Sequence, residues 1–198
     1  HANVYINGQK VGYWPYGYNS FHFDITKYLK PGEKNTLAVR LENLPESSRW
    51  YPGAGLYRNV HLIITEDAYI PVWGTYITTP SVNEKFAKVN VRTKVVLPEG
   101  ADPAKYSVET SVWNPNKQKL TAVRTSLAQM KYNNNQAEQE FVIQAPSLWS
   151  PEMPALYSAE TRLYEGDKLK DIYTTPFGIR SIEIIPDKGF FLNGKRTV

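Results

Sequence analysis

The sequence of 198 residues contains no cysteine, which excludes disulfide bridges and thiolate metal sites. Its histidines, His1, His22 and His61, are not spaced as metal ligands. No run approaches the roughly 18 apolar residues of a membrane-spanning helix, and the first residues lack the pattern of a secretory signal. We therefore expect no metal, no cofactor and no membrane partner. The compartment stays open between bacterial cytoplasm and periplasm.

The sequence also gives no indication of binding to nucleic acid or to nucleotides. A net charge of +4 could suit nucleic acid, but the basic residues are interleaved with acids, as in Lys27, Lys30, Glu33 and Lys34. This mixture predicts a solvated surface, so we expect no nucleic-acid partner. Nucleotide binding and serine-hydrolase chemistry are not expected either, because the sequence has no phosphate loop, no dinucleotide fingerprint and no G-x-S-x-G elbow.

The residues that are present predict an all-β protein. Apolar residues make up 41% of the chain and aromatic residues 13%, as in a folded globular protein. Asn7-Gly8 predicts a tight hairpin turn. Alternation predicts strands over residues 21–25 and 35–43, and the apolar run over 60–66 predicts a buried strand. A single helical turn is expected over residues 25–33, and we see no long amphipathic helix.

A change of composition near Asp67 predicts a domain boundary. After it, about seven strand-like runs follow one another at short spacing, which is typical of an immunoglobulin-like sandwich. The clearest run covers residues 88–97, where Val89 and Val91 lie on one face and Lys88 and Asn90 on the other. After Phe177 a third piece follows, in which we expect a second Asn-Gly hairpin around residues 193–194.

Three stretches together resemble the glycoside hydrolases of family 2. They are residues 4–62, which include SRWYPGAGLYRNVHL, residues 145–157, APSLWSPEMPALY, and residues 176–198, PFGIRSIEIIPDKGFFLNGKRTV. The resemblance implies three parts: the C-terminal part of a sugar-binding jelly roll (1–68), an immunoglobulin-like β-sandwich (69–177) and a hairpin leading into a (β/α)-barrel (178–198). It also implies a retaining enzyme of carbohydrate metabolism that hydrolyses terminal β-D-galactosides.

The loop RWYPGAGLYR supplies the candidate substrate-binding residues. Pro52 stiffens the loop, and Gly53 and Gly55 permit backbone geometry that a β-carbon forbids. Such a loop can hold out an aromatic and cationic cluster for a β-galactoside. The members of this cluster are Arg49, Trp50 and Tyr51. The alternative is structural: the two aromatic residues cap the core of the first domain, and Arg58 pairs with a carboxylate.

We expect no catalytic residue in this chain. Retaining glycosidases use two carboxylates about 5–5.5 Å apart, and the resemblance places both glutamates on later strands of a barrel that lies outside this sequence. Asn83-Glu84 copies the asparagine-glutamate pair of the family, but it falls in a polar loop between two strands. In the segment 145–157, Pro151 and Pro154 interrupt regular strand, and we expect Trp149 in the core.

Three alternatives stay open at this stage. The same family includes β-glucuronidases and β-mannosidases, and only the loop RWYPGAGLYR favours galactose. A stand-alone carbohydrate-binding or adhesion module would use the same folds, although such a module has no need of the segment 178–198. The expected partners are a carbohydrate substrate and the catalytic barrel, and a homo-oligomer remains open.

Overall fold

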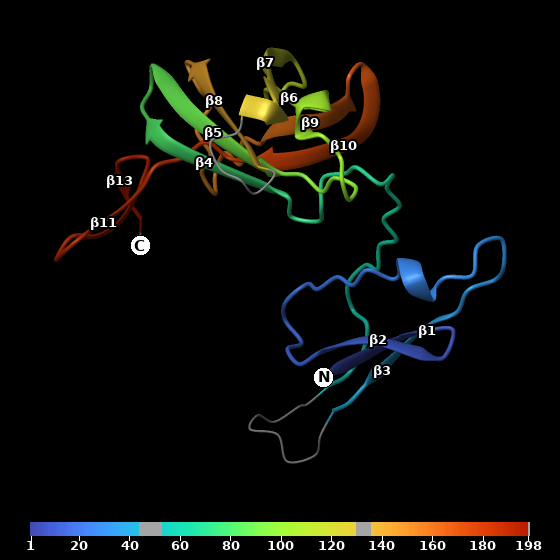
Figure 1. The fold of residues 1–198 in the computed structure, drawn as a ribbon. Helices are drawn as coiled ribbons and strands as arrows, with labels where there is room; N and C mark the ends of the chain where they lie inside the picture. The colour runs from blue at the N-terminus through green and yellow to red at the C-terminus, as the bar shows by residue number, and fades with distance from the viewer. Residues whose placement is uncertain (44–52, 130–135, 198) are drawn as a thin grey trace. The chain divides into compact units, whose positions relative to one another are not determined.

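A computed structural model describes residues 1–43, 53–129 and 136–197 of the chain. The chain divides into two compact units, His1–Ile63 and Ile64–Val198 (Figure 1). In the described residues, helix is confined to three short 3-10 turns: η1 (Thr26–Tyr28), η2 (Pro103–Lys105) and η3 (Leu127–Gln129). None of these is long or apolar enough to span a membrane. The predicted all-β class is confirmed.

The first unit contains a three-stranded antiparallel sheet in the order β2-β1-β3. Its strands are β1 (Ala2–Ile6), β2 (Gln9–Trp14) and β3 (Leu37–Leu41). Asn7 and Gly8 join β1 to β2 with φ of 52° and 82°, as a two-residue turn between right-twisted strands requires. The predicted Asn-Gly hairpin is confirmed. The buried apolar side chains of β1 are Ala2, Val4 and Ile6, and Asn3 between them is buried too.

The strand predicted over residues 21–25 is wrong, because this segment joins no ladder. Its aromatic side chains instead pack on one another and on β2. The Phe21 ring stacks on Trp14 with centroids 5.6 Å apart, and Phe23 lies 5.5 Å from Phe21. The alternating pattern correctly indicated that Phe21 and Phe23 share one packed face. Their rings are covered by other aromatic rings, so the segment does not need to pair as a strand.

The buried strand predicted over residues 60–66 is also wrong. The segment has no regular structure, and its apolar side chains are exposed, with Leu62 at 70% and Ile64 at 85%. A strand is buried only when a partner strand and a covering layer exist. Both edges of β1 are already paired with β2 and β3. No described segment pairs with residues 60–66.

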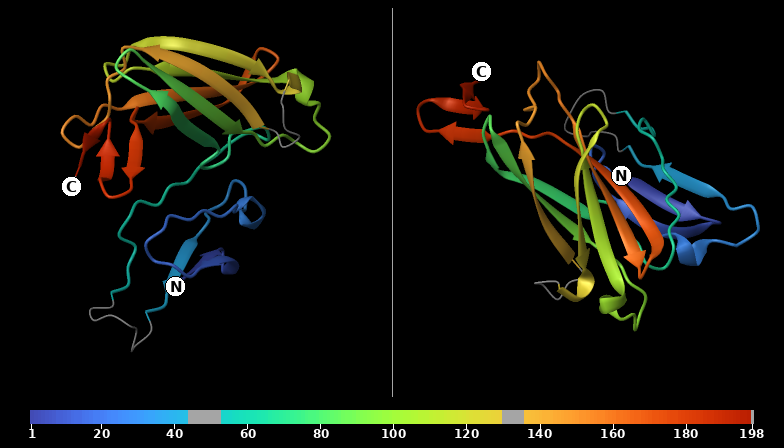
Figure 2. Two further views of the ribbon diagram at one scale, coloured as in Figure 1. Left: turned by 90° about the vertical axis from the view of Figure 1, so that its left-hand side faces the viewer. Right: turned by 90° about the horizontal axis from the view of Figure 1, so that it is seen from above.

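The second unit holds a seven-stranded antiparallel sandwich within its described residues (Figure 2). One sheet has the order β4-β5-β8 and the other the order β10-β9-β6-β7. The strands are β4 (Thr75–Val82), β5 (Phe86–Lys94), β6 (Tyr106–Trp113), β7 (Lys119–Ser126), β8 (Gln136–Gln144), β9 (Tyr157–Glu165) and β10 (Lys168–Phe177). A division into three and four strands is an immunoglobulin-like architecture.

The inner faces of both sheets form the core, as the alternation predicts. Val89, Val91 and Thr93 of β5 are fully buried, and the two valines share a core cluster with Val112 of β6 from the opposite sheet. Polar side chains also join the two sheets, and Gln139 is one of them. The Nε2 of Gln139 on β8 donates to the carbonyl oxygens of β6 residue 108 at 3.1 Å and β7 residue 123 at 2.7 Å.

A small sheet follows the sandwich, with strands β11 (Ile182–Ile185), β12 (Gly189–Leu192) and β13 (Lys195–Arg196). Asn193 and Gly194 form the turn between β12 and β13 with φ of 51° and 74°. The second predicted Asn-Gly hairpin is therefore confirmed.

Candidate functional site

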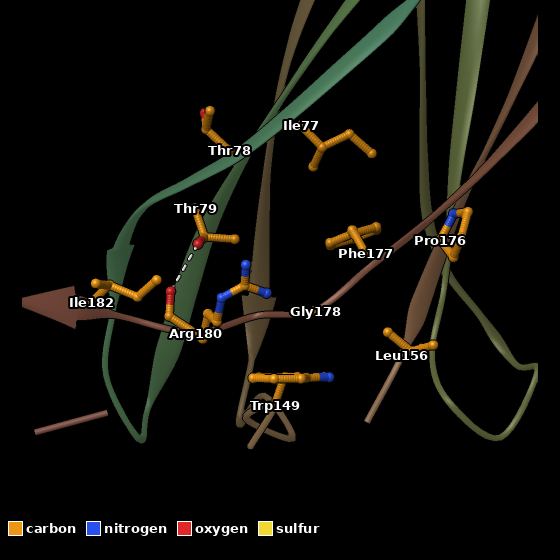
Figure 3. Close-up of a pocket in the computed structure, with 10 residues that line it drawn as sticks. All are labelled: Ile77, Thr78, Thr79, Trp149, Leu156, Pro176, Phe177, Gly178, Arg180 and Ile182. Atoms are coloured by element: carbon orange, nitrogen blue, oxygen red, sulfur yellow. Dashed lines mark hydrogen bonds between the residues drawn. The ribbon is translucent and has the colours of Figure 1, made fainter. Parts of the chain in front are cut away.

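An open groove of about 640 Å³ lies at one end of the sandwich in the second unit (Figure 3). Strand β4 and the end of β10 form part of its wall. The wall is completed by the segment before β9 that contains Trp149 and Leu156, called here the crossing segment, and by the chain that leaves β10. The lining residues are Ile77, Thr78, Thr79, Trp149, Leu156, Pro176, Phe177, Gly178, Arg180 and Ile182.

Trp149 and Arg180 form the polar centre of this groove. The guanidinium carbon of Arg180 lies 5.0 Å from the centre of the indole ring, within the range of a cation–π contact. The hydroxyl of Thr79 donates to the carbonyl oxygen of Arg180 at 3.0 Å, which holds the backbone of this arginine to β4 (Figure 3). Trp149 is half-buried and lines the groove. The expectation of a core tryptophan is therefore wrong.

Gly178 lets the chain pass close to the indole. A Cβ atom at this position would lie 2.8 Å from both Cβ and Cγ of Trp149, which is closer than real Cβ atoms approach. The glycine of the sequence PFGIR is thus required by packing, since its φ is not in the left-handed region. The close crossing brings Arg180 over the ring two residues later.

The groove can hold a partner but cannot cleave a glycosidic bond. Its lining contains no carboxylate, and Arg180 is its single ionisable side chain. Retaining hydrolysis needs a carboxylate nucleophile and a carboxylic acid that donates a proton. A guanidinium does neither near neutral pH, because it keeps its proton and has no lone pair to offer. The groove therefore suits recognition, with an apolar wall and a charged centre.

Carboxylates also gather around Lys170 in the second unit. Lys170 on β10 lies within 4.0 Å of Glu66, Asp67 and Glu165. Its ammonium group donates to Glu66 and Asp67, and this hydrogen bonding lowers the pKa of both carboxyls. A general acid needs the opposite, a raised pKa. This cluster is an ion-pair network, and no group of acids and histidines in the described residues could hold a metal ion.

Asn83 and Glu84 form part of the turn between β4 and β5. The Asn83 Oδ1 accepts hydrogen bonds from the backbone N–H groups of Lys85 at 2.8 Å and Phe86 at 2.9 Å. The asparagine thus closes a side-chain turn, and Glu84 is exposed at its tip. The contacts of Asn83 are therefore those of a turn residue.

The predicted substrate-binding residues Arg49, Trp50 and Tyr51 lie outside the described residues. The structure describes the loop from Gly53 onward. The hydroxyl of Tyr57 donates to the carbonyl oxygen of Gly17 at 3.4 Å, and the guanidinium of Arg58 lies 5.4 Å from the Tyr57 ring centre. The loop that follows the predicted cluster is therefore joined to the loop after β2, and it carries an exposed aromatic ring.

Comparison with known proteins decides the family. The family model for glycosyl hydrolases family 2 matches residues 69–180, which is the sandwich together with Arg180. The chain belongs to this family. The match of this family 2 chain ends inside the groove, so Trp149, Gly178 and Arg180 all lie within the matched region.

Relatives of this family 2 chain extend the likeness to both units. A β-galactosidase of Bacteroides ovatus, BoGH2A, is 39% identical over 99% of the chain and 23% of its own length. A putative β-glucuronidase of Formosa agariphila is 38% identical over 99% of the chain and 18% of its own length. A crystal structure of a family 2 member from Bacteroides cellulosilyticus has a TM-score of 0.85 at 34% identity, over 98% of the chain and 25% of its own. The chain thus spans about a quarter or less of these relatives.

The sequence contains the segments that form the groove, but it does not show that they meet. The segments around Trp149 and Arg180 both contributed to the family resemblance. Read locally, the first predicts a structural crossing and the second predicts the start of a barrel. Their meeting depends on a contact between positions far apart in the sequence, which periodicity cannot reveal.

Proposed function

We propose that this chain is the non-catalytic β portion of a retaining glycosidase that hydrolyses terminal β-D-galactosides. In this proposal residues 1–68 belong to a sugar-binding jelly roll, residues 69–177 are an immunoglobulin-like sandwich and residues 178–198 lead into the catalytic barrel. The observation that carries the proposal is the groove around Trp149 and Arg180, a recognition surface without carboxylates in a family of hydrolases.

The groove is the place where the catalytic barrel would dock. Its apolar wall continues onto one face of the small sheet, where Ile182 is 54% exposed, Ile184 is 77% exposed and Phe190 is 39% exposed. Ile184 and Phe190 are paired across β11 and β12, so they share that face. A contiguous apolar surface of this kind usually marks a protein interface. The greater length of the relatives supplies room for such a domain.

A β-galactoside is the substrate we infer, with a β-glucuronide as the second candidate. The galactosidase BoGH2A and the putative glucuronidase of Formosa agariphila are similar to this chain at 39% and 38% identity. The sequence SRWYPGAGLYR favours the galactosidase branch. In this proposal Arg49, Trp50 and Tyr51 reach the sugar, the arginine by donating hydrogen bonds and the tryptophan by stacking on the pyranose.

Activity assays on two proteins test this assignment. The first protein is the chain alone, and the second is the chain joined to a family 2 catalytic barrel. We expect no turnover of aryl β-galactoside by the first and turnover by the second, with kcat/KM higher for the galactoside than for the glucuronide. Turnover by the chain alone that survives repurification would refute the non-catalytic role. A preference for the glucuronide would refute the substrate assignment.

Docking is tested separately with two matched isoleucine substitutions. Ile184→Ser removes an apolar side chain from the proposed interface, while Ile172→Ser removes one that is 46% exposed on β10. In the chain alone both variants should melt near the wild-type temperature. In the protein that includes the barrel, only Ile184→Ser should lower the melting temperature. Equal effects of the two variants there would contradict the docking surface.

A further inference from the structure

The turn residue Asn193 holds three segments of the second unit together. Its backbone N–H donates to the carbonyl oxygen of Ser181 at 3.0 Å. Its side-chain Oδ1 accepts from the backbone N–H of Ser181, also at 3.0 Å. Its Nδ2 donates to the carbonyl oxygen of Trp149 at 3.0 Å. One residue therefore joins the start of β11 to the crossing segment of the sandwich.

The two hydrogen bonds between Asn193 and Ser181 extend the ladder of β11 and β12 by one residue pair. Ile182 pairs with Leu192 in the ladder of β11 and β12, so Ser181 and Asn193 form the next pair. At Asn193 the backbone turns away with φ of 51°. The side-chain carbonyl takes the place of the backbone carbonyl that would otherwise accept from Ser181. The ladder thus gains one more pair of bonds, while Nδ2 remains free to reach Trp149.

The same arrangement recurs at Asn7 in the first unit. Ile6 pairs with Leu37, and Asn7 stands opposite Thr36 as the next pair. The Asn7 N–H donates to the Thr36 carbonyl at 2.9 Å, and the Thr36 N–H donates to Asn7 Oδ1 at 3.0 Å. Asn7 Nδ2 then donates to the carbonyl oxygen of Tyr28 at 3.0 Å. Two independent Asn-Gly turns therefore use asparagine as the same three-way connector.

The chain around Ser181 is fixed from the other side as well. The backbone N–H of Trp149 donates to the carbonyl oxygen of Ile179 at 2.8 Å. Thr79 donates to the carbonyl of Arg180, and the Arg180 side chain lies on the indole of Trp149. The backbone from residue 179 to residue 181 is consequently bonded at each position, and Asn193 is the only one of these contacts that comes from the small sheet itself.

We propose that Asn193 is a positioning residue that sets the orientation of the small sheet, β11 to β13, relative to the sandwich. Without it, the sheet would lose the hydrogen bond that its own turn makes to the crossing segment, and it could rotate about residues 179–181. The local claim stands on the contacts above. Its consequence for catalysis, that the barrel is held at one angle, rests on the proposed function.

Asparagine is the residue that meets all the demands of this position. A left-handed backbone is open mainly to glycine, asparagine and aspartate. Glycine lacks both side-chain bonds, and aspartate at neutral pH keeps the acceptor but loses the donor. Asn193→Asp should therefore break only the bond to Trp149, whereas Asn193→Gly should break that bond and the bond from Ser181. Both variants keep the turn.

Nuclear magnetic resonance on the chain 1–198 can separate orientation from folding. Amide exchange at Ser181 reports its bond to Asn193, and residual dipolar couplings of β11 to β13 report the angle between sheet and sandwich. In Asn193→Gly we expect Ser181 to exchange roughly two- to tenfold faster, the factor for one lost hydrogen bond. The couplings of the small sheet should shrink relative to those of the sandwich. Asn193→Asp should keep Ser181 protected and give intermediate couplings.

Asn7→Gly is the matched control, because it changes the same type of turn in the other unit. It should speed exchange at Thr36 and leave the couplings of β11 to β13 at their wild-type values. Wild-type couplings in Asn193→Gly would overturn the proposal. Loss of exchange protection at Thr197, whose N–H donates to Phe190 within the small sheet, would overturn it too, by showing that Asn193 only forms the turn. Neither measurement depends on enzyme activity, so failure here leaves the proposed function standing.

Discussion

The ammonium nitrogen of Lys170 lies 3.1 Å from Oδ1 of Asp67, and only 7% of the Lys170 side chain is exposed. Lys170 comes from β10, and Asp67 lies just before the sandwich begins. Asp171 adds to this connection, because its Oδ2 accepts from the backbone N–H of Ile70 at 2.8 Å. The strand β10 thus fixes the chain that leads into the sandwich at two neighbouring positions.

Lys170→Met should lower the melting temperature of the second unit. The substitution leaves Glu66, Asp67 and Glu165 near one another without the cation they share, so repulsion replaces attraction. Lys168→Met is the control, because Lys168 is 67% exposed and lies 3.7 Å from Glu66. Exposed pairs contribute little, and this variant should melt near the wild type. Calorimetry of the three proteins would show whether the two lysines differ, and equal melting temperatures would contradict the network.

The effect of Lys170→Met should depend on pH. Hydrogen bonding from Lys170 lowers the pKa of Glu66 from 4.5 and that of Asp67 from 3.8. A lowered carboxyl pKa stabilises the fold above the unfolded-state pKa, and this stabilisation disappears as the pH falls through the folded-state value. The pKa of Lys170 is raised from 10.5. Its stabilising contribution is therefore complete below pH 10.5 and is lost only as the pH rises from there through the higher folded-state pKa. Urea unfolding should therefore show a stability difference between wild type and variant at pH 7 that shrinks toward pH 3.

Gly178→Ala should disturb the groove. The added methyl would meet Trp149 at 2.8 Å, and overpacking of this kind costs about 1–3 kcal/mol. Gly17→Ala is the control, because a Cβ at Gly17 meets nothing within 4 Å. Chemical denaturation should show a loss of stability for the first variant and a change within about 0.5 kcal/mol for the second. A neutral Gly178→Ala would mean that the indole can move aside.

Arg49→Ala tests the proposed sugar contact in the protein that includes the catalytic barrel. A hydrogen bond from a charged donor contributes on the order of 1.5–3 kcal/mol, so kcat/KM should fall roughly ten- to a hundredfold. If Arg49 contacts the sugar as proposed, the melting temperature should stay close to that of the wild type, because substitutions outside a core change stability little. The reverse pattern, a lower melting temperature with unchanged kcat/KM, would make Arg49 a structural residue.

The features that the sequence predicted well are local ones. The two Asn-Gly turns follow from the conformations open to Asn7 and Asn193, and the buried face of β5 follows from a period of two in residues 88–97. The strands predicted over residues 21–25 and 60–66 failed for the opposite reason. Their patterns signal apolar side chains, but pairing depends on whether another segment offers a free edge.

The groove could not be predicted from local sequence patterns for a related reason. Trp149 looks like a core residue in its own segment, and nothing in the segment of Arg180 links it to that tryptophan. Only the close passage of Gly178 brings the guanidinium over the indole. The three-way bonding of Asn193 is hidden in the same way, since the sequence specifies the turn but not the segments within reach of its side chain.

The exposed run over residues 60–65, VHLIIT, has a consequence for how the chain behaves in solution. It combines β-branched and apolar residues with no proline and no charge, which is the composition of segments that assemble into intermolecular β-structure. Val60, Leu62, Ile63 and Ile64 are each at least 60% exposed. At high concentration these segments would pair between molecules.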